Sequence, residues 1–345
     1  MDTRLGLAQI GLGRWGPNLF RNFVNHPEVD VLYACDRDES KLAKVQSPGL
    51  PLVETTTDAG IIFADPRVQA VVVATPVSTH FALCKQALEA GKHVMVEKPL
   101  AGSVAECEEL VALADARGLK LMVGHVFVYN RGIRYIKNLI DSGELGDIHC
   151  IHSQRTNLGP IRLDTNSLWD LGTHDISIFN YWLGNSPTAV SSVESHALGG
   201  PFADIVNTSF YYPNNVLCQV LCSWLHPEKV RRIIVVGAQK MVVWDDMRPD
   251  APVTIYDKGV ETKSEQTEGT FAEFGFMLRG GDVRIPMVPM AEPLRTECNE
   301  FVRFALHDEP TESDGHMGLQ VVRILAAADE SHRRQCALVD PSSLQ

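Results

Sequence analysis

Lys98 occupies a position where a basic side chain could act on a substrate. It follows the apolar run 93–96, within Glu97-Lys98-Pro99. A buried, unpaired lysine is costly in its charged form, so this ammonium is expected to face a cleft. There it could donate to a substrate oxygen and stabilise negative charge as a hydroxyl becomes a carbonyl, or the reverse. The Lys-Pro bond can also adopt the cis form. From spacing alone, a surface Glu-Lys pair in a loop explains the tripeptide equally well.

Asp170 and His174 are a second candidate pair. The segment 169–183 has the apolar spacing of a helix, and both side chains lie at one edge of its apolar stripe. A partly desolvated imidazole can exchange protons near neutral pH, and Asp170 could orient it or bind a sugar hydroxyl. For an isolated pair, a capping aspartate and a core histidine would be the better interpretation. The functional interpretation gains weight from a third motif, which requires a proton acceptor elsewhere in the chain.

That third motif is a glycine triplet directly after the apolar run 5–10. Its pattern is Gly-x-Gly-x-x-Gly, in which the glycines permit a tight turn, backbone approach to a pyrophosphate and close packing of helix on strand. An acid about 20 residues further on, the usual companion of this triplet, follows the run 29–35 as Asp36. An ordinary glycine-rich turn is the alternative. The residues expected to contact a dinucleotide here are Gly11, Gly13, Arg14, Trp15, Gly16, Asp36 and Arg37.

The elements that must position these residues alternate between strand and helix up to about residue 124, which predicts a parallel sheet covered on both faces. The expected strands are 5–10, 29–35, 68–74, 93–96 and 120–123, and the expected helices are 17–25, 78–90 and 103–117. Ser78 and Ser103 can cap helix N-termini, while Gly91 and Gly118 stand at C-terminal cap positions. Ligands of such sheets bind beyond the carboxyl ends of the strands. We therefore expect further cofactor contacts from Thr75, Pro76, His80, Glu97, Lys98 and His125.

Beyond residue 124 the pattern changes to that of an α+β domain. A helix is expected near 130–142, followed by alternating segments at 148–157, 189–196, 205–212, 216–224, 232–236 and 241–244. These predict a large open, mainly antiparallel sheet. Residues 246–268 are expected to form an irregular surface excursion, and two helices near 293–306 and 315–333 to pack on the sheets. The predicted fold class is α/β, with domains at 1–124 and 125–345.

Composition narrows the possible partners. The chain has 345 residues and a formal net charge of −12, which opposes binding to nucleic acid or an anionic membrane. A membrane span and a signal peptide are not expected. The eight cysteines are scattered, which is typical of reduced thiols in a cytoplasmic protein, and no metal site is predicted from their spacing.

Taken together, these motifs resemble the glucose–fructose oxidoreductase/inositol dehydrogenase/rhizopine-catabolism (Gfo/Idh/MocA) family. The resemblance extends over nearly the whole chain and includes the glycine loop, residues 74–80, Glu97-Lys98-Pro99 and Asp170-x-Gly172-x-His174. It implies a Rossmann domain that binds NAD(P), and a C-terminal domain used for substrate binding and for assembly into a homodimer or homotetramer. It also implies catalysis by Lys98, Asp170 and His174.

Two segments, 11–19 and 154–162, resemble bacterial members that oxidise nucleotide sugars, some at the 3-hydroxyl of UDP-N-acetylglucosamine or its uronic acid. Arg155 and Arg162 would then bind a carboxylate or diphosphate, although a solvated pair is as good an interpretation of either one. The chain departs from the family pattern at His125 and at residues 128–130, which weakens the transfer of substrate contacts from this segment.

The expected mechanism has His174 take the proton of a sugar secondary hydroxyl while the carbinol hydride passes to the nicotinamide. Lys98 would polarise the oxygen and Asp170 would hold the sugar. Asp36 would repel a 2′-phosphate and so favours NAD, whereas Arg37 leaves NADP possible. The alternatives are a dehydrogenase of inositol, other polyols or free sugars, an NAD-dependent glycosidase, and a catalytically silent NAD-binding regulatory protein.

Overall fold

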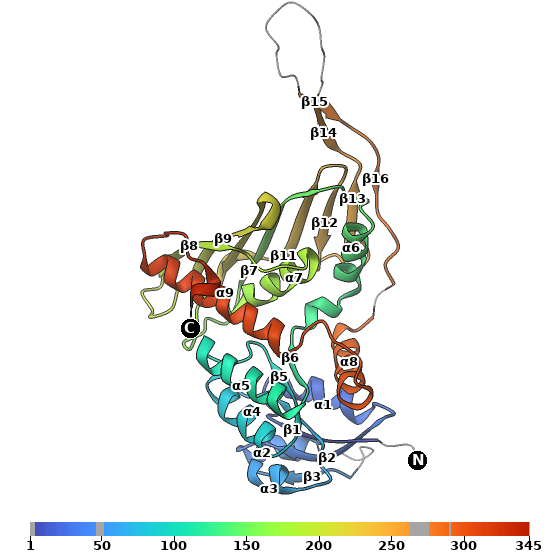
Figure 1. Cartoon of the computed structure of the whole chain (residues 1–345), viewed down its shortest axis with the longest axis vertical. Coiled ribbons are helices and arrows are strands. Elements are labelled where there is room, and N and C mark those ends of the chain that lie inside the picture. Colours follow the sequence, from blue (N-terminus) through green and yellow to red (C-terminus); the bar gives the residue numbers. More distant parts are fainter. Residues whose placement is uncertain (1–3, 46–51, 263–275, 290, 345) are drawn as a thin grey trace, which may run out of the picture. The chain divides into compact units, whose positions relative to one another are not determined.

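The computed structural model describes residues 4–45, 52–262, 276–289 and 291–344, and it divides the chain into two units (Figure 1). Unit 1 comprises residues 1–130, 291–326 and 342–345, and unit 2 comprises residues 131–290 and 327–341. The sequence pattern places one boundary at residue 124. The structure differs because residues 291–326 return to the first unit and pack there.

The sheet of unit 1 has six parallel strands in the order β3-β2-β1-β4-β5-β6. The strands are β1 (Leu5–Ile10), β2 (Val29–Cys35), β3 (Glu54–Thr56), β4 (Ala70–Val73), β5 (His93–Glu97) and β6 (Leu121–Gly124). Every residue of β1, β4 and β6 is buried, as the continuous apolar runs predict for a sheet covered on both faces. The parallel sheet is therefore confirmed. The edge strand β3 lacks such a run and was not predicted.

Within the described residues, seven helices belong wholly or partly to unit 1; among them, α1 packs on α8 and α4 packs on α5. They are α1 (Gly16–Val24), α2 (Glu39–Leu42), α3 (Ala59–Ala64), α4 (His80–Glu89), α5 (Val104–Arg117), α8 (Pro293–His307) and the first part of α9 (Gly315–Arg333), with short 3₁₀ turns at Ala43–Val45, Val77–Thr79, Val126–Tyr129 and Pro341–Ser343. Ser103 caps α5, since its Oγ accepts from the Glu106 N–H. The capping prediction for Ser78 is wrong, because this residue lies inside a 3₁₀ turn that precedes α4.

Residues 291–326, the C-terminal segment of unit 1, are hydrogen-bonded to the edge strand β6. The N–H of Val123 donates to the carbonyl of Ser313 at 2.8 Å. The Tyr129 hydroxyl lies 2.8 Å from both the Ser313 and the Thr311 hydroxyl oxygens. Between α1 and α8, the rings of Phe23 and Phe301 meet edge to face with centroids 6.2 Å apart. These contacts make the C-terminal segment part of the first core.

Unit 2 is built on an eight-stranded sheet in the order β16-β13-β12-β11-β7-β10-β9-β8. Its strands are β7 (Ile148–Leu158), β8 (Ala189–Ser195), β9 (Ile205–Tyr212), β10 (Val216–Ser223), β11 (Leu225–Gly237), β12 (Met241–Asp245), β13 (Val253–Tyr256) and β16 (Val283–Arg284); β14 (Gly259–Thr262) and β15 (Phe276–Arg279) pair separately. One neighbouring pair, β7 with β10, is parallel and the others are antiparallel. The mainly antiparallel sheet is confirmed. The prediction of an irregular excursion at 246–268 is wrong for the residues that form β13 and β14. Residues 263–268 lie outside the described part of the chain.

Helices α6 (Arg131–Asp141) and α7 (Thr173–Leu183) belong to unit 2 and pack together. The Trp182 indole N–H, on α7, donates to the Ile133 carbonyl on α6 at 2.9 Å. A π-helical turn, η4 (Leu168–Gly172), precedes α7. The single helix predicted at 169–183 is therefore two elements, and the π turn contains Asp170.

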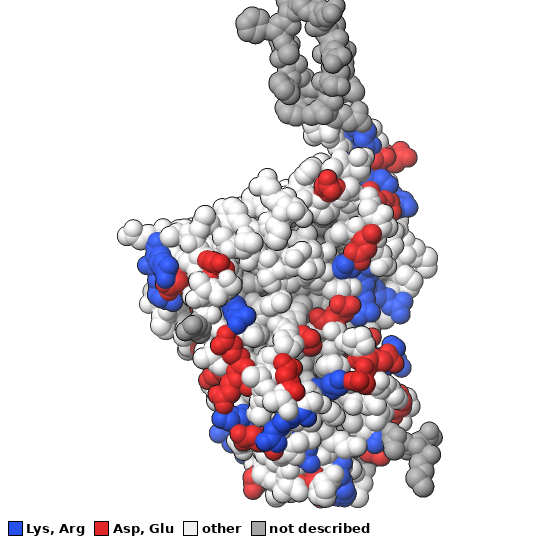
Figure 2. Space-filling view, in the orientation of Figure 1, with Lys and Arg blue, Asp and Glu red and all other residues white. Residues whose placement is uncertain are grey.

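The surface carries interspersed charges on the face shown in Figure 2. All eight cysteines are free thiols, and six are buried. Within the part of the chain that the structure describes, none of the helices has both the length and the hydrophobicity that crossing a membrane requires.

Candidate active site

The three glycines of the first loop differ in their surroundings: two are crowded by the chain and one is open. Gly11 has φ +101°, and a Cβ there would lie 2.3 Å from the Ala74 carbonyl oxygen. A Cβ on Gly16 would lie 2.3 Å from the Gly11 carbonyl oxygen. A Cβ on Gly13 would meet no atom of the described residues within 4 Å, so this side of the loop is open. The open position corresponds to the one where the motif requires a phosphate to approach the backbone.

The side chain of Gln9 holds the glycine loop by two hydrogen bonds, a role that the sequence analysis did not predict. Its Nε2 donates to the carbonyls of Gly11 at 3.0 Å and Gly16 at 2.8 Å. The one signal available in the sequence was a polar amide within the apolar run 5–10, which the structure shows to be fully buried. Helix α1 starts at Gly16 with no acidic residue in its first turn, so its N–H groups present positive charge at the loop.

Asp36 lies at the carboxyl end of β2, next to the loop. Its carboxylate accepts from the N–H groups of Leu12 at 2.8 Å and Asp38 at 3.0 Å, and it pairs with Lys41 at 3.3 Å. Burial alone would raise the pKa of Asp36, but these two N–H donors and Lys41 together hold it below its usual value. Asp36 is therefore ionised at neutral pH and suits a ribose diol. Arg37 is exposed beside it.

The loop after β4 is fixed by hydrogen bonds of its own. The Thr79 hydroxyl donates to that of Thr75 at 2.7 Å. The ring nitrogens of His80 each lie 2.9 Å from a carbonyl oxygen, one of Thr75 and one of Pro99. His80, expected to contact the cofactor, thus connects the two loops through its ring nitrogens. Burial lowers its pKa, and both of its ring nitrogens already contact the chain itself.

Glu97-Lys98-Pro99 ends β5 with a cis Lys98-Pro99 bond. Burial raises the pKa of Glu97 to about 7, with the charge of Lys98 opposing the rise. Glu297 on α8 is completely buried, and its pKa is raised far more, by burial and by the negative charge of Glu97. Neither carboxyl oxygen of Glu297, nor Oε1 of Glu97, has a hydrogen-bond partner among the described residues. The pair therefore keeps a proton at neutral pH, and Glu297 had no signal in the sequence pattern.

His125 lies at the end of β6 with its side chain completely buried. Burial lowers its pKa to about 3, and the positive charge of Lys98 adds to this effect. Neither of its ring nitrogens has a hydrogen-bond partner within the described chain. The ring is therefore neutral at physiological pH. With Glu97, it places buried polar atoms that lack a partner among the described residues at the same end of the sheet as Lys98.

In unit 2, Asp170 is held by two side chains. The Trp224 indole N–H donates to Asp170 Oδ2 at 3.3 Å, and Arg162 Nη1 lies 3.5 Å from Asp170 Oδ1. His174 follows in the first turn of α7 and is half-buried. Between them, a Cβ on Gly172 would lie 2.6 Å from Leu168 Cδ1 and 3.0 Å from the Cys222 sulfur. This crowding explains why a glycine stands at the centre of Asp170-x-Gly172-x-His174. The contact of Trp224 with Asp170 was not predicted, because Trp224 lies far from Asp170 in the sequence.

The two arginines expected to bind substrate differ in the structure. Arg155 is 2% exposed and pairs with the buried Asp175, with Nε to Oδ2 at 2.6 Å. The Ser153 hydroxyl also donates to Asp175. The substrate-binding expectation for Arg155 is therefore corrected: the guanidinium is neutralised in the core. Arg162 is partly exposed and forms two hydrogen bonds to Asp164, at 2.9 and 2.7 Å.

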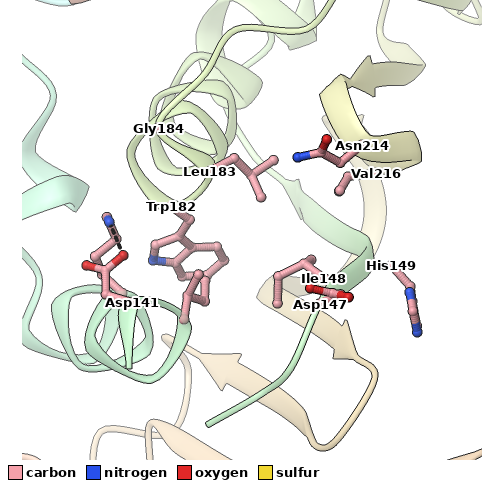
Figure 3. A pocket seen from close by; sticks show the side chains of 11 residues that line it. Asp141, Asp147, Ile148, His149, Trp182, Leu183, Gly184, Asn214 and Val216 are labelled. Atoms are coloured by element: carbon pink, nitrogen blue, oxygen red, sulfur yellow. Dashed lines mark hydrogen bonds and ion pairs between the residues drawn. The ribbon is translucent and has the colours of Figure 1, made fainter. Parts of the chain in front are cut away.

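Unit 2 also has a hollow of about 670 Å³ (Figure 3). Its lining residues come from α6, the end of α7, and the starts of β7 and β10: Lys137, Ile140, Asp141, Asp147, Ile148, His149, Trp182, Leu183, Gly184, Asn214 and Val216. Trp182 and Ile148 are among the labelled side chains around it. None of the residues predicted to bind cofactor or substrate lines this hollow, so it is separate from the candidate active site.

Comparison with known proteins agrees with this geometry. Residues 5–125 match the model of an oxidoreductase family with an NAD-binding Rossmann fold, and residues 133–243 match the model of the GFO/IDH/MocA C-terminal domain. The uncharacterized oxidoreductase YrbE of Bacillus subtilis (strain 168) is 24% identical over 339 residues, which are 96% of this chain and 95% of YrbE.

Relatives with a named activity include the dTDP-3,4-didehydro-2,6-dideoxy-alpha-D-glucose 3-reductase of Streptomyces violaceoruber. It is 30% identical over 200 residues, 55% of this chain and 56% of that enzyme. Three other curated relatives are likewise matched over only 37% to 62% of their length. Inositol 2-dehydrogenases are also among the relatives.

Among solved structures, GenD2 from gentamicin A biosynthesis, in complex with NAD, superposes with a TM-score of 0.80 at 26% identity. The match covers 98% of this chain and 96% of GenD2. The two family models, together with the glycine loop and the acid at the end of β2, lead to one conclusion: the chain belongs to the Gfo/Idh/MocA family of NAD-binding oxidoreductases.

Proposed function

We propose that this oxidoreductase transfers a hydride between NAD and a secondary hydroxyl of a sugar or nucleotide sugar. The observation that carries the proposal is the position of Lys98. It directly follows β5, beside the neutral His125 and at the same carboxyl end of the parallel strands as the glycine loop and Asp36. A cationic donor at the edge where a dinucleotide binds is suited to polarise the oxygen of a reacting carbinol.

Each proposed role follows from the local chemistry of one residue. The loop and the α1 N-terminus bind the phosphates, and Asp36 accepts hydrogen bonds from the ribose hydroxyls. The nicotinamide, when bound, accepts or supplies the hydride. His174 takes the hydroxyl proton while Lys98 stabilises the oxygen, so the alcohol loses a proton and a hydride and becomes a carbonyl. Asp170, oriented by Trp224 and Arg162, holds a substrate hydroxyl.

The roles of Lys98 and His174 are tested by Lys98→Ala and His174→Ala. We expect each to lower kcat by roughly 1,000-fold or more, because removing a positioned general acid or base typically removes a factor of this order. The NADH dissociation constant should stay within about threefold of the parent value. Lys85→Ala and His149→Ala remove a lysine and a histidine of the same two units and serve as matched controls. Turnover near the parent level in either test variant would refute the assignment.

The substrate class is proposed from the relatives and from the partly exposed Arg162, the one of the two predicted arginines that is not neutralised in the core. We expect nucleotide sugars of the UDP-N-acetylglucosamine type to support the fastest change in nicotinamide absorbance, ahead of free sugars and inositol. Arg162→Gln should raise KM for a nucleotide sugar by about 10-fold more than KM for a free sugar, because both substrates also lose the support that Arg162 gives to Asp170. If inositol gives the highest kcat/KM, the substrate is a polyol and not a nucleotide sugar. Cleavage of a glycoside would indicate a glycosidase.

We also propose that the eight-stranded sheet supports a homodimer or homotetramer. Tyr211 on β9 is 41% exposed and Val193 on β8 is 56% exposed, so these strands carry apolar side chains that another copy could cover. The mass of the protein by light scattering after gel filtration tests this. A single-chain mass at all concentrations would contradict it.

A further inference from the structure

Glu194, His196 and His332 form a cluster that the proposed reaction does not use. Glu194 is on β8, His196 follows that strand, and His332 is near the end of α9; all three belong to unit 2 (Figure 1). One potential ligand atom from each lies within 4.8 Å of the others. His196 Nε2 is 4.0 Å from Glu194 Oε2, and the two imidazole centroids are 6.5 Å apart.

Two polar atoms of this cluster are buried without a hydrogen-bond partner among the described residues. They are Oε1 of Glu194 and Nδ1 of His332. The Glu194 side chain is only 8% exposed, so its carboxylate is largely desolvated. Buried polar atoms of native proteins are nearly always paired with protein, water or an ion, and an unpaired carboxylate is especially costly. A cation held between the three side chains would supply a partner that the described residues do not.

The backbone around the cluster fixes the direction of its side chains. Glu194 and His196 are two residues apart at the end of a strand, which places them on the same face. His196 Nδ1 lies 3.1 Å from the Gly200 carbonyl oxygen, so it carries the proton and leaves the Nε2 lone pair available. Ser331, directly before His332, accepts from the Ser192 N–H at 3.0 Å and connects α9 to β8.

A second carboxylate adds negative potential to the cluster. Asp329 is near enough to act electrostatically on both Glu194 and His332. Its own oxygens accept from the Asn166 amide at 3.0 Å and from the Trp169 indole at 2.9 Å. We therefore place Asp329 outside the ligand set, as a neighbouring carboxyl group whose oxygens are already paired with Asn166 and Trp169.

We propose that Glu194, His196 and His332 bind a transition-metal dication of the zinc type. Two imidazoles and one carboxylate are ligands that Zn²⁺ takes at about 2.0–2.2 Å, which places tetrahedral ligand atoms ~3.4 Å apart. Small side-chain rotations would bring the present separations to that value. His196 is 40% exposed, so water can complete the coordination. The bound ion would connect the edge strand β8 to the end of α9.

The test uses the full-length, tag-free protein after its metal has been removed with a chelator. Zn²⁺ is titrated in competition with a chromophoric indicator, and we expect one tight site per chain. Glu194→Gln, His196→Ala and His332→Ala should each weaken binding by roughly 100-fold or more, since each removes one of three protein ligands. Zn²⁺ should also raise the melting temperature of the parent protein and not that of the variants.

His152→Ala is the matched control. It removes another imidazole of unit 2, one whose Nε2 lies 3.3 Å from the Cys150 sulfur and which is the obvious competing zinc ligand. This variant should keep the parent affinity. The proposal is overturned if the parent binds Zn²⁺ no more tightly than Glu194→Gln, or if His152→Ala is the variant that loses binding. Because His196 is exposed, His196→Ala decides the question even if a substitution at the buried Glu194 impairs folding.

Discussion

At the scale of residues, the glycine loop shows how one motif combines folding and binding requirements. Gly11 and Gly16 are required by the chain itself, since any side chain would collide with a carbonyl oxygen. Gly13 faces open space, so packing does not require a glycine there, and we propose that the bound dinucleotide does. The three positions can therefore be separated by experiment.

Gly11→Ala should destabilise the protein by at least about 2 kcal/mol, because φ +101° disfavours alanine and the new Cβ would meet the Ala74 carbonyl. Gly13→Ala should change stability by less than about 0.5 kcal/mol and raise the NADH dissociation constant roughly 10-fold or more. Melting curves and fluorescence titration with NADH measure the two effects. Equal loss of stability in both variants would contradict the assignment.

The buried carboxyl group of Glu297 gives a pH prediction. Its folded pKa lies above the unfolded value, so its contribution to stability is fully present below the unfolded pKa and is lost as pH rises through the folded pKa. Glu297→Gln mimics the protonated form. Compared with the parent, this variant should gain stability progressively as pH rises above the unfolded pKa of glutamate, from about 5 into the alkaline range.

Melting temperatures of the parent and Glu297→Gln across that pH range provide the measurement. Glu300→Gln, on the same helix α8, is the control for removing a carboxyl group from that helix. A pH-independent difference between Glu297→Gln and the parent would mean that burial does not raise the pKa of Glu297.

At the scale of elements, helix starts show where local pattern succeeds and fails. Ser103 and Ser78 both precede helical patterns, but Ser103 caps α5 while Ser78 lies in a 3₁₀ turn before α4. The difference arises because His80, the first residue of α4, is held by the carbonyls of Thr75 and Pro99. Tertiary hydrogen bonds thus determine the start of α4.

Ser103→Ala should therefore lower the free energy of unfolding by about 1 kcal/mol, the usual effect of removing a helix cap. Ser78→Ala should change it by less than about 0.5 kcal/mol, because this hydroxyl caps no helix. Chemical denaturation monitored by circular dichroism compares the two. Similar losses in both variants would show that Ser78 also stabilises the start of its helix.

At the scale of the whole molecule, the first unit is completed by the C-terminal part of the chain. Residues 291–326 supply α8 and the start of α9, and they hydrogen-bond to β6 through Ser313. Because this core combines residues so far apart in sequence, we expect it to need residues 291–326 in order to form. The sequence pattern of residues 1–124, in contrast, predicts a domain that is complete without the C-terminal segment.

A fragment of residues 1–130 should therefore lack a cooperative thermal transition and bind NADH at least about 100-fold more weakly than the full chain. The expected cause is the loss of partners for Phe23 and Tyr129. Calorimetry and NADH titration on the fragment and the full chain test this. A cooperative fragment with the parent NADH affinity would show that residues 291–326 are dispensable for this unit.

The sequence by itself determined the parallel and antiparallel sheets, the glycine loop and Asp36, because local periodicity and turn chemistry encode them. It also supplied Lys98, Asp170 and His174, whose roles remain predictions. Only the tertiary structure showed that Arg155 is neutralised by Asp175, that Gln9 and Trp224 orient site residues, and that Glu297 approaches Glu97. It alone brought His332 to Glu194 and His196. The physical reason is that these contacts join residues distant in sequence, and no local pattern records which of them the folded chain brings together.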